Sequence, residues 1–194
     1  MAHSHAAIGQ PSQWVSRFAS LMPEGEVLDL ACGTGRHTKM LAALGHPVLA
    51  VDRDGAALAS AAGPGIQTLR IDLEQDGERP ISWPFAPGRY AGIVVTNYLH
   101  RPLLDEIMSS LMPGGVVIYE TFAEGNQRFG KPSNPDFLLR PGELLHAVQN
   151  AQPHSLEVVA YEHGYISQPA PAMVQRICAV MPSDDRDLTL LRLN

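Results

Sequence analysis

The sequence predicts one α/β domain built on a doubly wound, Rossmann-like sheet. Short apolar strands alternate with helical stretches over most of the chain, as is typical of a parallel sheet covered on both faces. A glycine-rich turn at 33–35 stands between the first strand and the helix after it. Three successive strands end in an aspartate, namely Asp29, Asp52 and Asp72. At 194 residues the chain has the size of a single domain, residues 1–194.

The composition is that of an ordinary globular protein. Apolar residues make up 45% of the chain and charged residues 18%. The net charge of -6 disfavours non-specific binding to nucleic acid, which requires a concentrated basic face. Cys32 and Cys178 are the only cysteines, so the sequence indicates neither a disulfide framework nor a zinc site. We expect two reduced, buried thiols.

The sequence shows no sign of a membrane segment or an export signal. No apolar stretch approaches the ~20 residues that span a bilayer, and the N-terminus lacks the charged and apolar regions of a secretory signal. We therefore expect a cytoplasmic protein. His3 and His5 lie in a polar leader, which is explained better by a flexible leader than by a metal site, so no metal is predicted.

The N-terminal part is predicted to be a helix followed by strand–helix units. Trp14, Val15, Phe18 and Leu21 are spaced by three and four, which places them on one face of a helix. The predicted elements of this part are a helix over 11–22, strands over 26–30, 47–51 and 67–71, and helices over 36–44 and 55–62.

The C-terminal part continues the alternation and then ends in two strands. Its predicted elements are strands over 92–96 and 116–119, a helix over 103–111 opened by Pro102, a helix over 142–148, and strands over 156–161 and 174–180 joined by a turn through Gly164 and 169–171. Because no helix separates the last two strands, we expect them to be antiparallel neighbours.

Residues 121–141, the 121–141 segment, are rich in Gly, Pro and Asn and exceed the usual length of a connection in a compact domain. Loops of this length are often lids, so we expect the segment to contribute to acceptor binding. Its basic and aromatic side chains suit an anionic or planar small molecule; they are Arg128, Phe129, Lys131, Phe137 and Arg140. The alternative is a solvated loop in which the two phenylalanines are pinned to the core.

The glycine-rich turn and the strand-end aspartates together indicate an adenosine-containing ligand. Gly33 and Gly35 allow the backbone to approach a ligand, and free amides at the start of the next helix point outward. Any tight strand-to-helix turn favours glycine, but the carboxyl ends of strands line the ligand crevice of a doubly wound sheet. Asp52, about twenty residues after the glycines, is placed to bind both ribose hydroxyls.

Two cofactor classes share this plan. A dinucleotide fingerprint has a third glycine three positions after Gly35, where this chain has Thr38. Asp29 would repel a pyrophosphate but suits the amino group of a methionine moiety. S-adenosylmethionine is therefore favoured. An NAD-dependent oxidoreductase is the first alternative, and a domain that binds S-adenosylmethionine without catalysis is the second.

Residues 26–35, EVLDLACGTG, resemble the first motif of the class I S-adenosylmethionine-dependent methyltransferases, an acidic residue followed by three glycines at alternate positions. Asp29, Gly33 and Gly35 match the motif, and Ala31 stands where the first glycine is expected. Within the family, the chain is similar to the small bacterial methyltransferases often labelled by similarity to tellurite-resistance or thiopurine enzymes.

This resemblance covers about residues 25–120, including the LMPGG turn at 111–115. It implies a seven-stranded sheet of order 3-2-1-4-5-7-6 with an antiparallel last strand, and S-adenosylmethionine as methyl donor. For the methionine part of the cofactor, the resemblance implies contacts from Asp29 to the amino group, from Gly33 and Gly35 with neighbouring Ala31 to the carboxypropyl chain, and from Asn97 to the methionine moiety. For the adenosine part, it implies contacts from Asp52 to the ribose and from Arg53, Asp72 and Leu73 to the adenine. The predicted layout is a helix and leader at 1–24, a cofactor half at 25–120, the 121–141 segment, and C-terminal strands at 142–194.

The predicted reaction is methyl transfer to a small-molecule acceptor. Transfer from a sulfonium is a direct displacement, so the protein mainly aligns the acceptor and excludes water. An oxygen acceptor usually requires a general base, and the candidates are Tyr98, His100 and Glu120, which follow the fourth and fifth strands on the crevice side. The alternatives are that His100 caps the following helix and that Tyr98 only packs. The sequence does not predict the oligomeric state or the acceptor.

Overall fold

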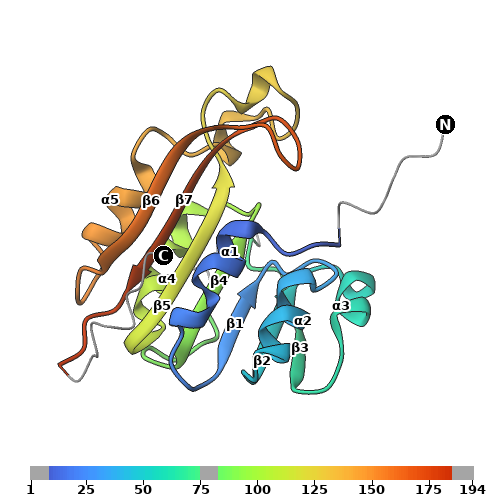
Figure 1. The fold of residues 1–194 in the computed structure, drawn as a ribbon, viewed down its shortest axis with the longest axis vertical. Coiled ribbons are helices and arrows are strands. Elements are labelled where there is room, and N and C mark those ends of the chain that lie inside the picture. Colours follow the sequence, from blue (N-terminus) through green and yellow to red (C-terminus); the bar gives the residue numbers. More distant parts are fainter. Residues whose placement is uncertain (1–8, 75–82, 185–194) are drawn as a thin grey trace.

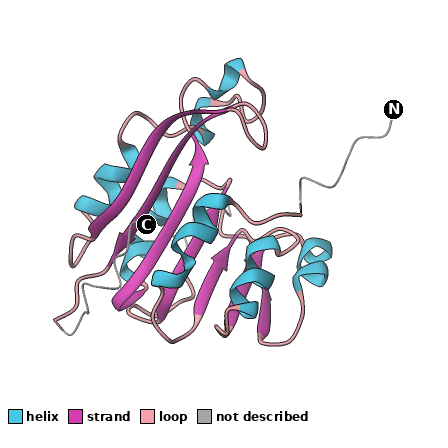
Figure 2. Ribbon diagram, viewed as in Figure 1, coloured by secondary structure: helices cyan, strands magenta, loops and turns pink. Residues whose placement is uncertain are grey.

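The computed structural model describes residues 9–74 and 83–184. Within these residues the strands form one seven-stranded sheet of order β3-β2-β1-β4-β5-β7-β6 (Figure 1, Figure 2). The strands are β1 Val27–Leu30, β2 Val48–Asp52, β3 Ile66–Arg70, β4 Tyr90–Thr96, β5 Leu111–Phe122, β6 Glu157–Ile166 and β7 Ala172–Val180. Strands β1 to β5 pair in parallel, and β7 is antiparallel to both β5 and β6. The predicted fold class and strand order are confirmed.

Helices cover both faces of the sheet. The α-helices are α1 Gln13–Phe18, α2 Arg36–Ala43, α3 Gly55–Ala61, α4 Leu104–Ser109 and α5 Glu143–Gln149, and the 3-10 helices are η2 Ala19–Leu21, η3 Arg101–Leu103, η4 Asn126–Arg128 and η5 Pro135–Phe137. Helices α1, α2 and α3 lie on one face of the sheet, and α4 and α5 lie on the other (Figure 2). Each described helix is too short or too polar to span a bilayer.

The core is divided by the alternation of side chains along the strands. Val27 packs in a buried cluster with Trp14 of α1, whereas the next residue, Leu28, packs in the opposite cluster with Ile107 of α4 and Leu144 of α5. Successive side chains of a strand point to opposite faces, so the uninterrupted apolar run of β1 serves both layers. This double coverage places the carboxyl ends of the central strands at one exposed edge.

All seven strand bounds differ from the prediction, most of them by one or two residues, and the large differences are in β5 and β6. Strand β5 begins at Leu111, which pairs with Tyr90 before the register shifts, so the predicted turn at 111–115 is an irregular start of the strand. The predicted turn at Gly164 is wrong, because Gly164 lies inside β6 opposite Val174. An edge strand tolerates a glycine that has no neighbour to pack against, and a Cβ placed at Gly164 would meet nothing within 4 Å.

The prediction that both cysteines are buried thiols is confirmed. Cys32 and Cys178 are both buried thiols. Burial, with the nearby charges of Asp29 and Asp52, raises the pKa of Cys32 to about 12, so this side chain is a neutral thiol at physiological pH. His3 and His5 lie outside the described residues.

Candidate cofactor site

A cavity of about 240 Å³ opens at the carboxyl ends of the central strands. It lies beside β1, which has β2 on one side and β4 on the other. The strand order reverses at this point, and doubly wound sheets bind their ligands where the order reverses. The lining residues are Leu30, Ala31, Val51, Asp52, Arg53, Ile71, Asp72, Leu73, Glu74, Asn97 and Tyr98. Six of the nine predicted cofactor residues are in this set, as is one predicted catalytic candidate, Tyr98. Of the other three predicted cofactor residues, Gly33 and Gly35 lie in the glycine turn, and Asp29 lies in β1 just before it.

The two glycines of the turn are required for different reasons. Both have left-handed backbone, with φ of 55° at Gly33 and 80° at Gly35. A Cβ at Gly35 would lie 2.5 Å from the Cβ of Ala61, so this glycine allows the turn to pack against α3. A Cβ at Gly33 would meet nothing within 4 Å, so the space on that side of the turn is open to a ligand.

Ala31 also has left-handed backbone, with φ of 54°. An L-residue with a Cβ is strained by about 1 kcal/mol or more in this region, which glycine occupies freely. The strain explains why a glycine is expected at this position of the motif. Asn97, at the end of β4, has the same conformation with φ of 55°. The two non-glycine residues with positive φ among the described residues therefore both line the cavity, as strained residues at functional sites often do.

Asp52 ties the glycine turn to the end of β2. Its Oδ2 accepts a hydrogen bond from the Gly33 amide at 2.8 Å, and its Oδ1 accepts one from the Asp54 amide at 2.9 Å. These bonds fix the orientation of the carboxylate at the cavity wall. Each carboxylate oxygen has a further lone pair, so Asp52 retains the capacity to accept hydrogen bonds from ribose hydroxyls.

Asp29 lies below the turn and stabilises the start of α2. Its side chain is buried, and its Oδ2 accepts a hydrogen bond from the Thr38 hydroxyl at 2.5 Å. It also accepts one from the Thr38 backbone, and Gly35 has no side chain to cap the helix. Burial raises the pKa of Asp29 to about 7, although the hydrogen bonds from Thr38 and the charge of Arg36 oppose this shift. Its predicted contact with a methionine amino group stays a prediction.

The mouth of the cavity is predominantly acidic. Arg53 forms an ion pair with Glu74 at 3.3 Å, and the Glu74 amide donates to the Asp72 carboxylate at 3.0 Å. The lining thus holds three carboxylates, those of Asp52, Asp72 and Glu74, against one guanidinium. Glu74 was not among the predicted site residues. The spacing of Asp72 and Glu74 fits an aspartate turn, in which the carboxylate accepts the amide two residues on, and this signal was present in the sequence.

Two catalytic candidates follow β4. Tyr98 lines the cavity, and its backbone carbonyl accepts a hydrogen bond from the Tyr119 hydroxyl at 2.9 Å. Burial and the acidic neighbours Glu74 and Asp72 raise the pKa of Tyr98 far above its usual value, so its phenol is neutral. The His100 side chain makes no capping hydrogen bond to η3, which corrects the capping alternative. Its Nε2 is buried and has no hydrogen-bond partner among the described residues.

The third candidate, Glu120, belongs to a cluster that anchors the N-terminal segment. Its Oε1 accepts a hydrogen bond from the Ser12 hydroxyl at 2.9 Å, and its Oε2 pairs with Arg176 at 3.3 Å. The Ser12 amide donates to Nε2 of His37 at 3.0 Å. Burial lowers the pKa of His37 to about 3, so its ring is a neutral acceptor. Both oxygens of Glu120 hold protein partners, and these contacts give it a structural function.

The predicted substrate residues of the 121–141 segment are exposed and lie outside the cavity lining. Arg128, Lys131 and Arg140 all carry exposed side chains. Phe129 is 44% exposed and contacts the Tyr165 ring with centroids 5.0 Å apart, and Phe137 is 47% exposed. The alternative in which both phenylalanines are pinned to the core is therefore wrong. Buried Leu138 and Leu139 fasten this part of the segment to the core instead.

Groups of three or more His, Cys, Asp or Glu side chains that could hold a metal ion are absent from residues 9–74 and 83–184. The charged groups of the site instead pair with each other and with backbone amides, as described for Asp52 and Glu74.

Known proteins resemble this chain in the part that carries the cavity. A family model described as a methyltransferase domain matches residues 27–115, which include every residue of the cavity lining. The chain is 30% identical over 125 residues to the protein-L-isoaspartate O-methyltransferase of Chlorobaculum tepidum, covering 62% of this chain and 57% of that enzyme. The matched family model ends within the irregular start of β5 and leaves the 121–141 segment outside.

Solved structures share the fold at low sequence identity. TehB from Haemophilus influenzae aligns with a TM-score of 0.68 and 18% identity over 88% of this chain and 62% of TehB. The geranyl diphosphate C-methyltransferase of Streptomyces coelicolor, solved with Mg²⁺, geranyl diphosphate and S-adenosylhomocysteine, aligns with a TM-score of 0.63 and 16% identity over 87% of this chain and 78% of that one. The chain thus spans less than two thirds of both the isoaspartate methyltransferase and TehB.

Replacing each of the two glycines by alanine should have a different main effect, on stability at Gly35 and on ligand binding at Gly33. Gly35→Ala should lower the free energy of unfolding by about 2 to 4 kcal/mol, since the new methyl overlaps Ala61 and strains the backbone. Gly33→Ala should cost about 1 kcal/mol of stability through strain alone but weaken binding of S-adenosylhomocysteine at least about tenfold, because the methyl fills the open side of the turn. Urea unfolding and calorimetric titration measure the two effects. Equal affinities for wild type and Gly33→Ala would contradict the assignment of that open side to a ligand.

Proposed function

Because this chain belongs to the class I S-adenosylmethionine-dependent methyltransferase family of enzymes, we propose that it binds S-adenosylmethionine in the strand-end cavity and transfers the methyl group to a small-molecule acceptor. One observation carries the proposal: six of the nine predicted cofactor residues, which come from four separate strand ends, line a single cavity. When bound, the cofactor supplies an electrophilic methyl group on a sulfonium, and the residues of the chain bind, orient and shield the reacting groups.

The cavity provides distinct groups for the parts of the cofactor. Asp52, fixed by the Gly33 and Asp54 amides, accepts the ribose hydroxyls. Arg53 and Leu73 enclose the adenine, with Asp72 at its polar edge. The open side of Gly33 and the strained backbone at Ala31 and Asn97 receive the methionine moiety, as the family resemblance implies.

The charge of the lining favours S-adenosylmethionine over NAD. Three carboxylates face one guanidinium in the lining, which attracts a sulfonium and an ammonium and repels a pyrophosphate. Thr38, at the position of the third glycine of a dinucleotide fingerprint, is buried and is occupied with Asp29. These features argue against the oxidoreductase alternative.

Calorimetric titration with S-adenosylhomocysteine and with NAD tests the cofactor assignment. We expect binding of S-adenosylhomocysteine and no measurable binding of NAD at the same concentrations. The reverse result would identify an oxidoreductase. Binding of S-adenosylhomocysteine without transfer of labelled methyl from S-adenosylmethionine to any component of a metabolite extract would support the non-catalytic alternative.

We assign the acceptor to the space between the end of β4 and the 121–141 segment. His100 is the group best suited to receive a proton from an oxygen acceptor, since its buried Nε2 has no protein partner in the described chain. Tyr98, held neutral, is a hydrogen-bond donor at the cavity wall. The exposed basic and aromatic side chains of the 121–141 segment favour an anionic, planar or partly apolar small molecule.

Removing the carboxylate of Asp52 tests the ribose assignment. Asp52→Ala should weaken S-adenosylhomocysteine binding by about 1 to 3 kcal/mol through lost charge-assisted hydrogen bonds. Asp54→Ala is the matched control, because it removes only the side chain that caps α3 outside the cavity lining and keeps the backbone amide that donates to Asp52. Loss of this cap should cost about 1 kcal/mol of stability with affinity unchanged. Isothermal titration of both variants measures the difference. An Asp52→Ala variant with the wild-type dissociation constant would refute the assignment.

The raised pKa of Asp29 predicts a pH-dependent affinity. If the Asp29 carboxylate pairs with the ligand ammonium, only its ionised form binds well, and that form predominates above its pKa of about 7. Affinity for S-adenosylhomocysteine should therefore rise about tenfold from pH 6 to pH 8. Asp29→Asn should bind with the same affinity at both values. His37 stays neutral over this range, because burial lowers its pKa to about 3. A pH-independent wild type would limit Asp29 to stabilising α2.

A further inference from the structure

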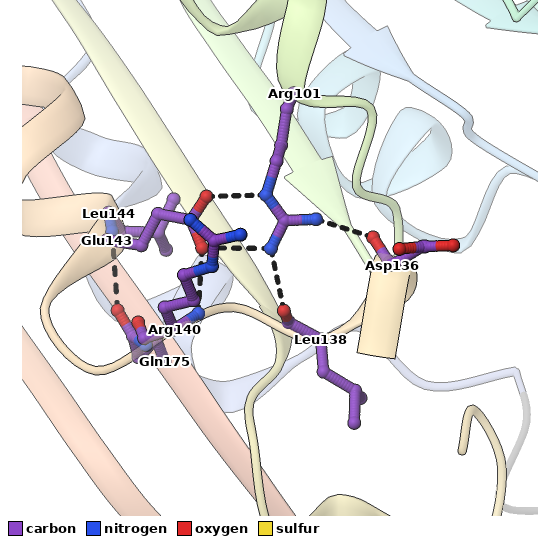
Figure 3. A network of polar contacts seen from close by, with 7 residues as sticks. All are labelled: Arg101, Asp136, Leu138, Arg140, Glu143, Leu144 and Gln175. Atoms are coloured by element: carbon purple, nitrogen blue, oxygen red, sulfur yellow. Dashed lines mark hydrogen bonds and ion pairs between the residues drawn. The ribbon is translucent and has the colours of Figure 1, made fainter. Parts of the chain in front are cut away.

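The guanidinium of Arg101 joins the end of β4 to the 121–141 segment and to α5. Arg101 is the first residue of η3 and follows the Asn97–His100 stretch directly. Its Nε donates to Oε1 of Glu143 at 2.6 Å and its Nη2 to Oε2 of Glu143 at 3.0 Å, a two-pronged pairing of guanidinium and carboxylate (Figure 3). Both side chains are shielded from water, with 30% and 17% of their surfaces exposed. Such shielded, two-pronged pairs fix geometry as well as charge.

The same guanidinium also holds the backbone of the segment. Nη1 donates to the carbonyl of Asp136 at 2.6 Å, and Nη2 donates to the carbonyl of Leu138 at 2.8 Å (Figure 3). Arg101 therefore contacts η5, the residue that follows it, and the first residue of α5. A lysine at this position carries a single nitrogen and has no equivalent fork.

The neighbouring parts of the segment are fastened to β7 by other side chains. Asn126 donates to the carbonyl of Pro132 at 3.0 Å and accepts from the Met173 amide at 3.2 Å. Gln175 donates to the carbonyl of Arg140 at 2.6 Å (Figure 3). These contacts hold both ends of the segment to the sheet, while Arg101 holds the stretch around η5 to the end of β4.

The other end of the Asn97–Arg101 stretch is part of the cofactor cavity. Asn97 and Tyr98 line the cavity. The Asn97 amide donates to the carbonyl of Glu120 at 2.9 Å, and the carbonyl of Tyr98 accepts from the Tyr119 hydroxyl. Five residues thus connect the cofactor wall with the residue that holds the segment, and each end is fixed by hydrogen bonds.

We propose that Arg101 is a positioning residue that sets the place of the 121–141 segment relative to the cofactor cavity. It acts through the fork to Glu143 and the two backbone carbonyls, and it has no direct contact with the reacting groups. The inference rests on the proposed function in assigning the acceptor to this segment. The coupling between cavity and segment is measured without any acceptor.

Cleavage by trypsin reports how readily the segment opens. Of its three basic residues, Lys131 and Arg140 precede prolines, which trypsin does not cleave, so Arg128–Phe129 is its one susceptible bond. Arg101 also precedes a proline, so replacing it removes no cleavage site. Mass spectrometry of a fragment that begins at Phe129 follows cleavage of this bond specifically.

Arg101→Ala and Arg101→Lys are compared with Arg89→Ala. Arg89 forms the same two-pronged pair with Glu26, with bonds of 2.8 and 3.1 Å, at the opposite end of β4. We expect cleavage after Arg128 to be at least about tenfold faster in both Arg101 variants and unchanged in the control. Affinity for S-adenosylhomocysteine should stay within about twofold of wild type in all three variants.

The second readout is the effect of the ligand on the segment. Saturating S-adenosylhomocysteine should slow cleavage of the wild type at least about twofold, because ordering Asn97 and Tyr98 orders the segment through Arg101. This protection should disappear in both Arg101 variants and persist in Arg89→Ala. A general loss of stability would instead speed cleavage at many sites and leave the ratio with and without ligand unchanged.

Two results for Arg101→Ala would overturn the proposal: cleavage after Arg128 at the wild-type rate, or protection by the ligand retained. A wild-type cleavage rate in Arg101→Lys would also overturn it, because the role of Arg101 would then be reduced to its charge. If the wild type does not bind S-adenosylhomocysteine, the proposed function fails. The ligand-free cleavage rates then still decide whether Arg101 holds the segment.

Discussion

The candidate site depends on one hydrogen bond, from the Gly33 amide to the carboxylate of Asp52. It connects the turn after β1 with the end of β2 and fixes both at the rim of the same cavity. Asp29 supports the turn from below by binding Thr38 in the first turn of α2. Without these two carboxylates, the left-handed backbone at Ala31, Gly33 and Gly35 would have few interactions to hold it in place.

The cavity and the 121–141 segment lie at different parts of the sheet. The parallel strands β1 to β4 carry the cavity, and the residues matched by the methyltransferase family model end at the start of β5. Strands β5, β6 and β7 are longer and extend beyond the others, with the 121–141 segment at their far end (Figure 1). Where a cofactor cavity lies beside a separate segment of different composition, one cofactor chemistry can serve different acceptors. The stretch after β4 connects the two parts through Arg101.

The sequence was sufficient to predict what depends on local pattern. Buried parallel strands are apolar throughout, so β1, β2 and β4 were recognisable. The expectation that Asp29, Asp52 and Asp72 lie at one edge followed from the geometry of a doubly wound sheet. The turn at Gly164 was wrong, because a glycine in an edge strand has the same local signal as a glycine in a turn. The contacts of Ser12 with Glu120 and of Arg101 with Glu143 join residues 108 and 42 positions apart. No local pattern marks such pairs, so the partners of Glu120 and Arg101 became visible only in three dimensions.

A crystal structure of the protein with S-adenosylhomocysteine would show whether the cavity holds the cofactor as proposed. We expect both ribose hydroxyls to lie within hydrogen-bonding distance of the Asp52 carboxylate, the Gly33 amide still to donate to that carboxylate, and the sulfur to face the end of β4. A ligand bound elsewhere, or an Asp52 carboxylate turned away from the ribose, would contradict the proposed site.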